Sequence, residues 1–197
     1  MTSIRNSLSV LVDPGSHVSG PVLDGVGDQL GRRRVTGVAA EADGPDMLGC
    51  MATLDGKPVS ADDLLRLALT NFGHFTSMRV DGDGSIRGLS LHMERLIRDC
   101  KIVWGADLDT TLVREYVRRA LEGQSSPCVV RVTIYDPKVE MGHPADADEP
   151  HIMVSVRGAG ALPPEPLRAM SVPYERDLPE VKHVGLFGAL HAPWAGC

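Results

Sequence analysis

One lysine lies in a segment whose composition could lower its affinity for a proton. Lys182 belongs to Asp177–Leu190 (DLPEVKHVGLFGAL), an irregular stretch that leads into a short apolar run typical of a helix start. A partly desolvated lysine loses its proton readily and becomes a nucleophile that forms Schiff bases with carbonyl groups. Most lysines are instead solvated surface charges, so the residue types alone leave both interpretations open. The neighbours that would supply apolar surroundings are Leu178, Val181, Val184, Leu186 and Phe187.

A second set of candidate residues begins an amphipathic helix. His92 and Arg95 are three residues apart near its first turn, so they share one face there. An arginine beside the free N–H groups of a helix start is suited to holding a phosphate. The alternative is a surface arginine paired with Glu94 or Asp99, which is the commoner situation.

Other side chains give weaker signals. The seven histidines show no ligand spacing such as H-x-x-x-H, so we expect no metal site. The DGDG sequence at 81–84 lacks the downstream ligands of a calcium loop, and it predicts a hairpin turn. Arg176 could meet a substrate carboxylate, although an ion pair with Glu175 or Asp177 is commoner.

The composition of the whole chain disfavours several function classes. The chain has 197 residues, enough for one or two domains, and a net charge of −6. Its longest basic run is Arg32–Arg34, so we expect neither nucleic acid nor an anionic membrane as a partner. Four scattered cysteines without a C-x-x-C pair fit free thiols in a reducing compartment. Since Leu8–Val12 is too short for a signal sequence or a membrane span, we expect a soluble cytoplasmic protein.

The first fifty residues differ in character from the remainder. Residues 1–50 are rich in Gly, Pro, Ser, Asp and Val and contain no aromatic residue, which predicts a disordered extension. Ser60 and Asp63 then form a capping-box pattern that begins a short helix, and Asn71–Gly73 end it. A hairpin is expected next, with one strand over 74–80 and a returning strand over 85–89.

Helices and then strands are expected after this hairpin. Apolar residues at spacings of three and four predict the first helix, Asp109 caps the second, and β-branched runs predict the strands. We expect α+β architecture, with an N-terminal lobe over 51–157, a linker over 158–166 and the start of a second lobe over 167–197. The expected elements are helices over 91–104 and 109–122 and strands over 128–135, 151–157 and 168–174.

Three motifs in order resemble those of the fold-type IV pyridoxal-phosphate enzymes. They are FGHFTSMRV (72–80), LHMERLIRDC (91–100) and LPEVKH (178–183). This family includes branched-chain aminotransferases, D-amino-acid aminotransferases and aminodeoxychorismate lyases. Its pattern is a G-x-F-x-x-x-R strand, an H-x-x-R-L helix and a later lysine, which fits Gly73, Phe75, Arg79, His92, Arg95, Leu96 and Lys182.

The resemblance, which covers about residues 51–190, implies a cofactor and roles for three residues. The cofactor is pyridoxal 5'-phosphate: Lys182 would form the Schiff base with it and act as catalytic base, and Arg95 would hold its phosphate. Phe75 would line the substrate pocket. The substrate would be an amino acid or an amino-chorismate-type small molecule, and the protein would be a homodimer if its fold is complete enough.

Shorter matches lean toward the lyases without deciding the reaction. The segment 75–80 resembles the lyase pattern F-T-T-x-R-V, and Lys182-His183 resembles its K-H. Transamination and lyase chemistry share their early steps, so both remain open.

The chain also departs from the family pattern. Tyr135-Asp136 replaces an arginine-glycine pair, and only fifteen residues follow Lys182, where Pro193 is expected to break a helix. The resemblance therefore implies a small N-terminal lobe followed by a truncated second lobe, with weak cofactor binding or inactivity. A non-catalytic remnant, serving as a dimerising or interaction fragment, is the alternative function.

Overall fold

The computed structural model describes residues 9–12, 51–147, 149–160, 162, 168–171 and 174–195. Helices and antiparallel strands are mixed, which confirms the α+β class. The strands are β1 (Ser9–Val12), β2 (Met51–Leu54), β3 (Lys57–Pro58), β4 (His74–Val80), β5 (Cys128–Tyr135), β6 (His151–Gly158) and β7 (Arg168–Ser171). The helices are α1 (Ala61–Thr70), α2 (Leu89–Trp104), α3 (Thr110–Leu121), a 3-10 turn at Pro144–Asp146, and α4 (Phe187–Ala195).

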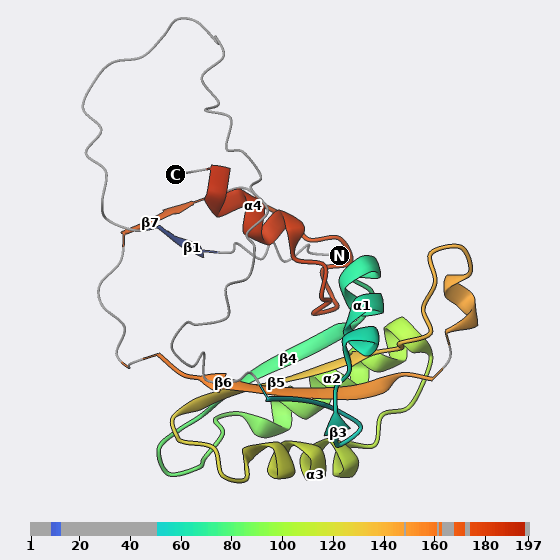
Figure 1. Ribbon diagram of the computed structural model, residues 1–197. Helices are drawn as coiled ribbons and strands as arrows, with labels where there is room; N and C mark the ends of the chain where they lie inside the picture. Colours follow the sequence, from blue (N-terminus) through green and yellow to red (C-terminus); the bar gives the residue numbers. More distant parts are fainter. Residues whose placement is uncertain are drawn as a thin grey trace, which may run out of the picture.

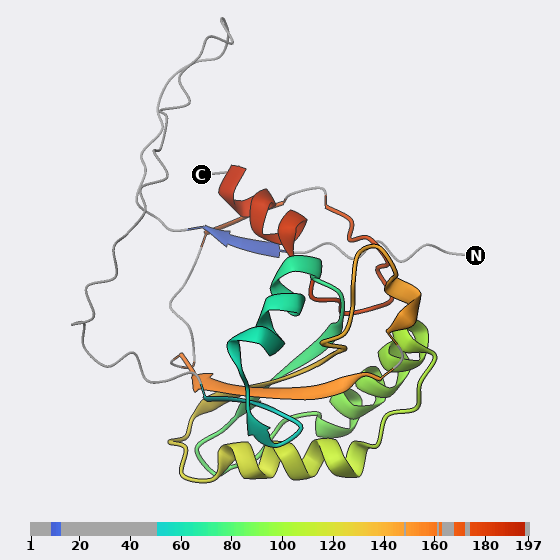
Figure 2. The same cartoon turned by 45° about the vertical axis from the view of Figure 1, so that its right-hand side comes forward.

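A five-stranded antiparallel sheet forms the main body, with the order β3-β2-β6-β5-β4. Strand β4 pairs along its whole length with β5, from His74 opposite Ile134 to Val80 opposite Cys128. Helices α2 and α3 cover one face of this sheet, and α1 lies on the opposite side (Figures 1 and 2). The core fills the space between the sheet and the two helices, and its fully buried members include Leu96, Cys100, Val113, Val130, Val132, Ile134 and Val154.

Helix α2 shows why the sequence pattern located this core. Met93, Leu96 and Cys100 recur at spacings of three and four and are buried, whereas Ile97 and Ile102 point to solvent. Glycines with left-handed φ values cap both ends, at Gly88 and Gly105. The predicted helix over 91–104 is confirmed, and it begins two residues earlier than expected.

Two further helix predictions are confirmed at their caps. Ser60 and Asp63 form a complete capping box, with the Asp63 N–H donating to Ser60 Oγ and the Ser60 N–H donating to Asp63 Oδ2. Asn71, in the left-handed conformation, ends α1. The Asp109 side chain accepts hydrogen bonds from the first N–H groups of α3.

The edge of the sheet at β4 is extended by the segment around Lys182. The Phe75 N–H donates to the Lys182 carbonyl, and the Val184 N–H donates to the Gly73 carbonyl, both at 2.9 Å. Gly73 has a φ of +153°, and a Cβ atom there would lie 2.7 Å from the Ile134 carbonyl oxygen, so this position requires glycine. Lys182 is therefore attached to β4 although more than 100 residues separate them in the sequence.

Several predictions of local structure need correction. The returning strand over 85–89 is wrong: one bridge joins Val80 and Ile86, and the left-handed φ of +68° at Gly88 then turns the chain into α2. Strands β2 and β3 were not expected, because they are short and follow a segment without period. Helix α4, over Phe187–Ala195, includes Pro193, so the prediction that this proline breaks the helix is wrong.

The expected extension and linker lie mostly outside the described residues. Within 1–50, the four residues of β1 form an antiparallel pair with β7, with Ser9 opposite Ser171. The strand expected over 168–174 is described as β7, which ends at Ser171. No helix in the described part of the chain combines the length and the apolar character needed to cross a bilayer.

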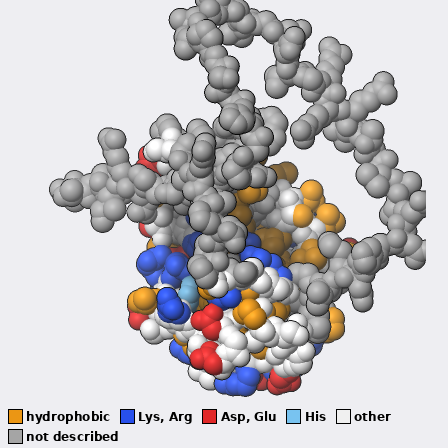
Figure 3. Space-filling view, turned by 90° about the vertical axis from the view of Figure 1, so that its left-hand side faces the viewer, with side chains coloured by type: hydrophobic (Ala, Val, Ile, Leu, Met, Phe, Trp, Pro, Cys, Tyr) orange, Lys and Arg blue, Asp and Glu red, His pale blue; other side chains and the backbone are white. Residues whose placement is uncertain are grey.

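Helices α1 and α4 carry exposed hydrophobic side chains, as do α2 and several loops. Leu65 and Leu69 of α1 and Phe187 and Leu190 of α4 are all more than half exposed. On the face shown in Figure 3, hydrophobic side chains (orange) lie beside Lys and Arg side chains (blue).

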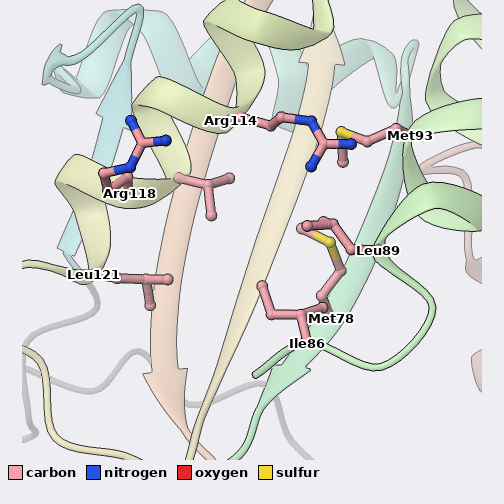
Figure 4. A pocket seen from close by; sticks show the side chains of 8 residues that line it. Met78, Ile86, Leu89, Met93, Arg114, Arg118 and Leu121 are labelled. Atoms are coloured by element: carbon pink, nitrogen blue, oxygen red, sulfur yellow. The ribbon is translucent and has the colours of Figure 1, made fainter. Parts of the chain in front are cut away.

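A small apolar cavity of about 200 Å³ lies between β4 and helices α2 and α3. Figure 4 shows the Arg114 side chain reaching from α3 across its rim toward Met93. Its other lining residues are Met78, Ile86, Leu89, Val117, Arg118 and Leu121. None of the candidate site residues of the sequence is among them, so this cavity is separate from the surroundings of Lys182.

The packing of α2 predicts a contrast between two neighbouring positions. Leu96→Ala removes a fully buried side chain and should lower the free energy of unfolding by about 3 kcal/mol. Ile97→Ala, at a 43% exposed position one residue later, should change it by less than about 1 kcal/mol. Urea unfolding followed by circular dichroism measures both, and equal losses would contradict this account of the core.

Candidate functional site

The backbone of Lys182 is held from two sides. Its carbonyl accepts the Phe75 N–H on β4, and its own N–H donates to Asp99 Oδ2 on α2 at 2.9 Å. Asp99 is fully buried, and its other carboxylate oxygen accepts hydrogen bonds from the Arg98 guanidinium. The lysine is therefore fixed at a junction of β4, α2 and the segment that leads to α4.

The Lys182 side chain is half-buried beside an aromatic ring. Its Nζ lies 4.9 Å from the centroid of Phe75, within cation–π range. Burial lowers the pKa of Lys182 below its ordinary value, and the charges of Arg95, Arg176 and Arg131 lower it further, while Asp99 opposes them. More of the amine is therefore in the nucleophilic, unprotonated form than in a solvated lysine.

A second cation lies against the same aromatic ring. The guanidinium carbon of Arg131 on β5 is 3.7 Å from the Phe75 centroid. Phe75 is opposite Thr133 and Ser77 is opposite Arg131, so alternation along the strands puts Phe75 and Arg131 on one face of the sheet. Burial lowers the pKa of Arg131, and the nearby Arg157 charge adds to this effect.

Arg95 lies in a polar cluster with two side chains. Its Nη2 donates to the Thr76 hydroxyl oxygen and to His92 Nδ1, the latter at 3.0 Å. Thr76 Oγ1 also lies 2.7 Å from His92 Nδ1. Since an arginine can only donate, His92 Nδ1 is the acceptor. Burial lowers the pKa of His92, and the charges of Arg95 and Lys182 lower it further. Arg95 Nε is buried without a hydrogen-bond partner in the described residues.

Positive charge exceeds negative charge around Lys182. Three arginines lower its pKa through their charges, and Asp99 is the one carboxylate that acts in the opposite direction. Asp99 is itself already paired with Arg98. Such an excess of cations in a partly buried place favours an anionic ligand.

The structure brings together the three residues that the sequence nominated. Phe75, Arg95 and Lys182 form one cluster: Lys182 contacts the Phe75 ring, Arg95 donates to Thr76 beside Phe75, and the Arg95 charge lowers the pKa of Lys182. The commoner alternative for Arg95, an ion pair with Glu94 or Asp99, is absent from the described ion pairs; Asp99 pairs with Arg98 instead.

Sequence reasoning missed Arg131 and the positions of Thr76 and Asp99. Arg131 could have been found from the register of β4 and β5, which places it diagonally across from Phe75. Asp99 looked like an ordinary helix-surface carboxylate, because no local pattern indicates that the Lys182 segment packs against it.

Arg176 and His183 hydrogen-bond to backbone carbonyl groups. The Arg176 guanidinium donates to the His183 carbonyl at 2.8 Å, rather than pairing with Glu175 or Asp177 in the described ion pairs. His183 Nε2 lies 2.7 Å from the Asp177 carbonyl oxygen. Within the described ranges, no group of three or more His, Cys, Asp or Glu side chains could hold a metal ion.

The sequence model of the amino-transferase class IV family matches residues 73–193, more than half of the chain. The chain belongs to this family. The matched region contains all three residues of the cluster, Phe75, Arg95 and Lys182. Pyridoxal 5'-phosphate is the cofactor that class IV membership indicates.

Solved structures of aminotransferases and a lyase resemble parts of the chain. A branched-chain aminotransferase from the archaeon Thermoproteus uzoniensis matches with 24% identity and a TM-score of 0.47, over 57% of this chain and 42% of that one. The 4-amino-4-deoxychorismate lyase from Pseudomonas aeruginosa matches with 26% identity and a TM-score of 0.40, over 57% and 41%. A PLP-bound hypothetical aminotransferase from Mycobacterium tuberculosis matches with 21% identity and a TM-score of 0.41, over 55% and 39%.

The chain spans about two fifths of the length of these solved structures. A comparison with curated protein sequences found no match. The assignment to class IV therefore rests on the family match over residues 73–193.

The residues present fit the cofactor of the class IV family. An aldehyde needs an accessible amine of lowered pKa, which Lys182 provides. A phosphate needs cationic N–H donors that are not already hydrogen-bonded within the protein. The buried Nε of Arg95 is such a donor, because it has no acceptor among the described residues. Both requirements are met within one cluster.

His74, next to Phe75, makes the stability of the protein sensitive to acid. Its ring is fully buried, neither ring nitrogen has a described hydrogen-bond partner, and burial lowers its pKa to about 4. The unfolded chain binds this proton below about pH 6.5, whereas the folded protein binds it only below about pH 4. Stability contributed by the neutral ring is therefore present above pH 6.5 and lost as the pH falls toward 4.

We predict that His74→Leu flattens this acid dependence. Between pH 7 and pH 4 the wild-type protein should lose about 3 kcal/mol more of its unfolding free energy than the variant. Urea titrations at several pH values measure the two slopes. His143→Leu, at an exposed histidine, should keep the wild-type slope. Parallel slopes for wild type and His74→Leu would show that His74 is not the responsible group.

Proposed function

We propose that the protein is a pyridoxal-phosphate-dependent enzyme that acts on amino acids, by transamination or by lyase chemistry of the aminodeoxychorismate type. The observation that carries this proposal is the half-buried Lys182 amine, beside Phe75 and within the electrostatic reach of Arg95. When bound, pyridoxal phosphate supplies an electron sink for the bonds at the substrate α-carbon. The protein's residues supply attachment, orientation and proton transfer.

Lys182 has two tasks in this proposal. Its amine holds the aldehyde carbon of the cofactor covalently, and once released it removes the proton from the substrate α-carbon. Both tasks require an unprotonated amine near neutral pH, and the lowered pKa of Lys182 provides a larger fraction of it. The backbone contacts to Phe75 and Asp99 keep the amine in one place during both tasks.

Arg95 is the proposed phosphate ligand. Its contacts with Thr76 and His92 orient the guanidinium and leave Nε free. An oxygen of the dianionic phosphate would accept from this group, since charge-assisted hydrogen bonds to guanidinium are strong and directional.

Phe75 and Arg131 are proposed to face the substrate. The Phe75 ring offers an apolar wall, and the Arg131 guanidinium that stacks on it can pair with a substrate carboxylate. An amino acid carries such a carboxylate, and an amino-chorismate-type compound also does. A homodimer, in which the exposed apolar side chains of α1 and α4 are covered, is part of the same proposal.

Covalent attachment is the first test. Pyridoxal phosphate added to the wild-type protein should give an absorbance band near the visible range, and borohydride should then fix one adduct on the peptide that contains Lys182. Lys182→Ala should abolish the adduct, because the attacking amine is gone. Lys101→Ala, at an exposed lysine, should leave it unchanged.

A folded wild-type protein that forms no adduct at Lys182 would overturn the proposal. It would favour the alternative of a non-catalytic interaction fragment, and circular dichroism shows whether the sample is folded. Adducts spread over several exposed lysines would count against a built site in the same way.

The phosphate role of Arg95 has its own test. Arg95→Gln should weaken binding of pyridoxal phosphate by about 10- to 100-fold, the range expected for a lost charge-assisted hydrogen bond. Pyridoxal, which lacks the phosphate, should lose much less affinity, because the variant keeps Lys182 and Phe75 and affects the amine only by removing the Arg95 charge that lowers its pKa. Spectroscopic titration gives the affinities, and Arg118→Gln on α3 is the control for a change of charge. Equal losses for both compounds would refute a phosphate contact.

A further inference from the structure

Asp99 lies at the centre of a buried network that reaches Lys182 through its backbone. One carboxylate oxygen accepts the Lys182 N–H at 2.9 Å, and the other accepts Nη2 and Nε of Arg98 at 2.7 and 3.0 Å. The same Arg98 Nη2 donates to the Glu180 carbonyl at 2.9 Å. The Asp99–Arg98 pair thus holds the chain at two points, 180 and 182, on either side of Val181.

Burying the Asp99 carboxylate costs free energy, which its hydrogen bonds must offset. Its side chain is fully buried while that of Arg98 is 55% exposed, so the ion pair is only half removed from water. A buried carboxylate is tolerated when it accepts several hydrogen bonds, and Asp99 accepts three. One of these bonds joins α2 to the Lys182 backbone, and the other two come from Arg98, which itself donates to the Glu180 carbonyl.

We propose that Asp99 is a positioning residue for Lys182: it anchors the lysine backbone against α2 and supplies the negative charge that opposes the surrounding arginines. This inference rests on the proposed function, in which Lys182 removes a proton and must then hold it; the Asp99 charge favours that protonated amine. Asp99 touches neither cofactor nor substrate and acts through Lys182.

The charges that act on the lysine come from α2, from β5 and from its own segment, whereas its contact on β4 is the uncharged Phe75. Arg95 and His92 belong to α2, Arg131 belongs to β5, and Arg176 belongs to the segment before Lys182. All of these disfavour a protonated Lys182 when they are charged, and Asp99 favours it. Removing the Asp99 charge should therefore leave the amine more easily deprotonated.

Competitive labelling of the full chain without cofactor tests the charge effect. Trace acetic anhydride acylates only unprotonated amines, and peptide mass spectrometry reports Lys182 against the exposed Lys57 in the same sample from pH 6 to 11. In Asp99→Asn the pH midpoint of Lys182 labelling should fall by about 0.5 unit or more. Glu94→Gln, which removes a charge from an exposed position of the same helix, should leave the midpoint where it is.

Arg98→Gln should shift the pH midpoint of Lys182 labelling in the opposite direction, and it keeps the inference testable if Asp99→Asn does not fold. Arg98 is largely exposed, and its loss leaves the Asp99 carboxylate uncompensated, so the Lys182 midpoint should rise. General damage to the fold would move both midpoints in the same direction. A folded Asp99→Asn protein with the wild-type midpoint, or a lower midpoint in Arg98→Gln, would overturn the proposal.

Amide hydrogen exchange tests the anchoring. Asp99→Asn keeps an oxygen that can accept the Lys182 N–H, so the peptide around 181–184 should stay protected. Asp99→Ala removes the acceptor and should increase exchange at Lys182, while α3 stays as protected as in the wild type. Unchanged protection in a folded Asp99→Ala protein would contradict the anchoring role.

These results are separable from the proposed function. A wild-type protein that gives no Lys182 adduct with pyridoxal phosphate fails the proposed function, whatever the labelling shows. A labelling midpoint that does not respond to Asp99 fails this inference, even where the adduct forms.

Discussion

The site depends on one short piece of antiparallel pairing at the edge of the sheet. Two backbone hydrogen bonds, from Phe75 to Lys182 and from Val184 to Gly73, attach a segment near the end of the chain to β4. Gly73 permits this approach, because a side chain there would meet the Ile134 carbonyl. Without the pairing, Lys182 would be an ordinary lysine in an irregular loop. With it, the amine is held beside Phe75 and in the field of three arginines.

Electrostatics then give the site its chemical character. The chain as a whole is acidic, with a net charge of −6, yet positive charge is concentrated around Lys182. Burial and neighbouring cations both favour the neutral amine, and the unpaired Arg95 Nε favours an anion. Attachment to an aldehyde and recognition of a phosphate are two demands of one cofactor, and they are met by residues from β4, α2 and the segment before α4.

The sequence predicted the helices and strands better than the tertiary contacts between them. The period of α2, the capping box at Ser60 and the β-branched run of β5 are local patterns, so their predictions were confirmed. The strand expected over 85–89 failed because a single bridge and Gly88 turn the chain directly into α2. Lys182 and Arg95 were candidates from their local sequence, and the family resemblance gave them their roles. Arg131 and Asp99 became visible only through strand register and tertiary packing, which no local pattern encodes.

A crystal structure of the protein with pyridoxal phosphate tests the central claim most directly. The account predicts continuous electron density from Lys182 Nζ to the cofactor, with the phosphate against the Arg95 guanidinium and the Lys182 carbonyl still paired with Phe75. A lysine side chain directed into bulk water, remote from Arg95, or a cofactor bound elsewhere on the protein, would contradict it.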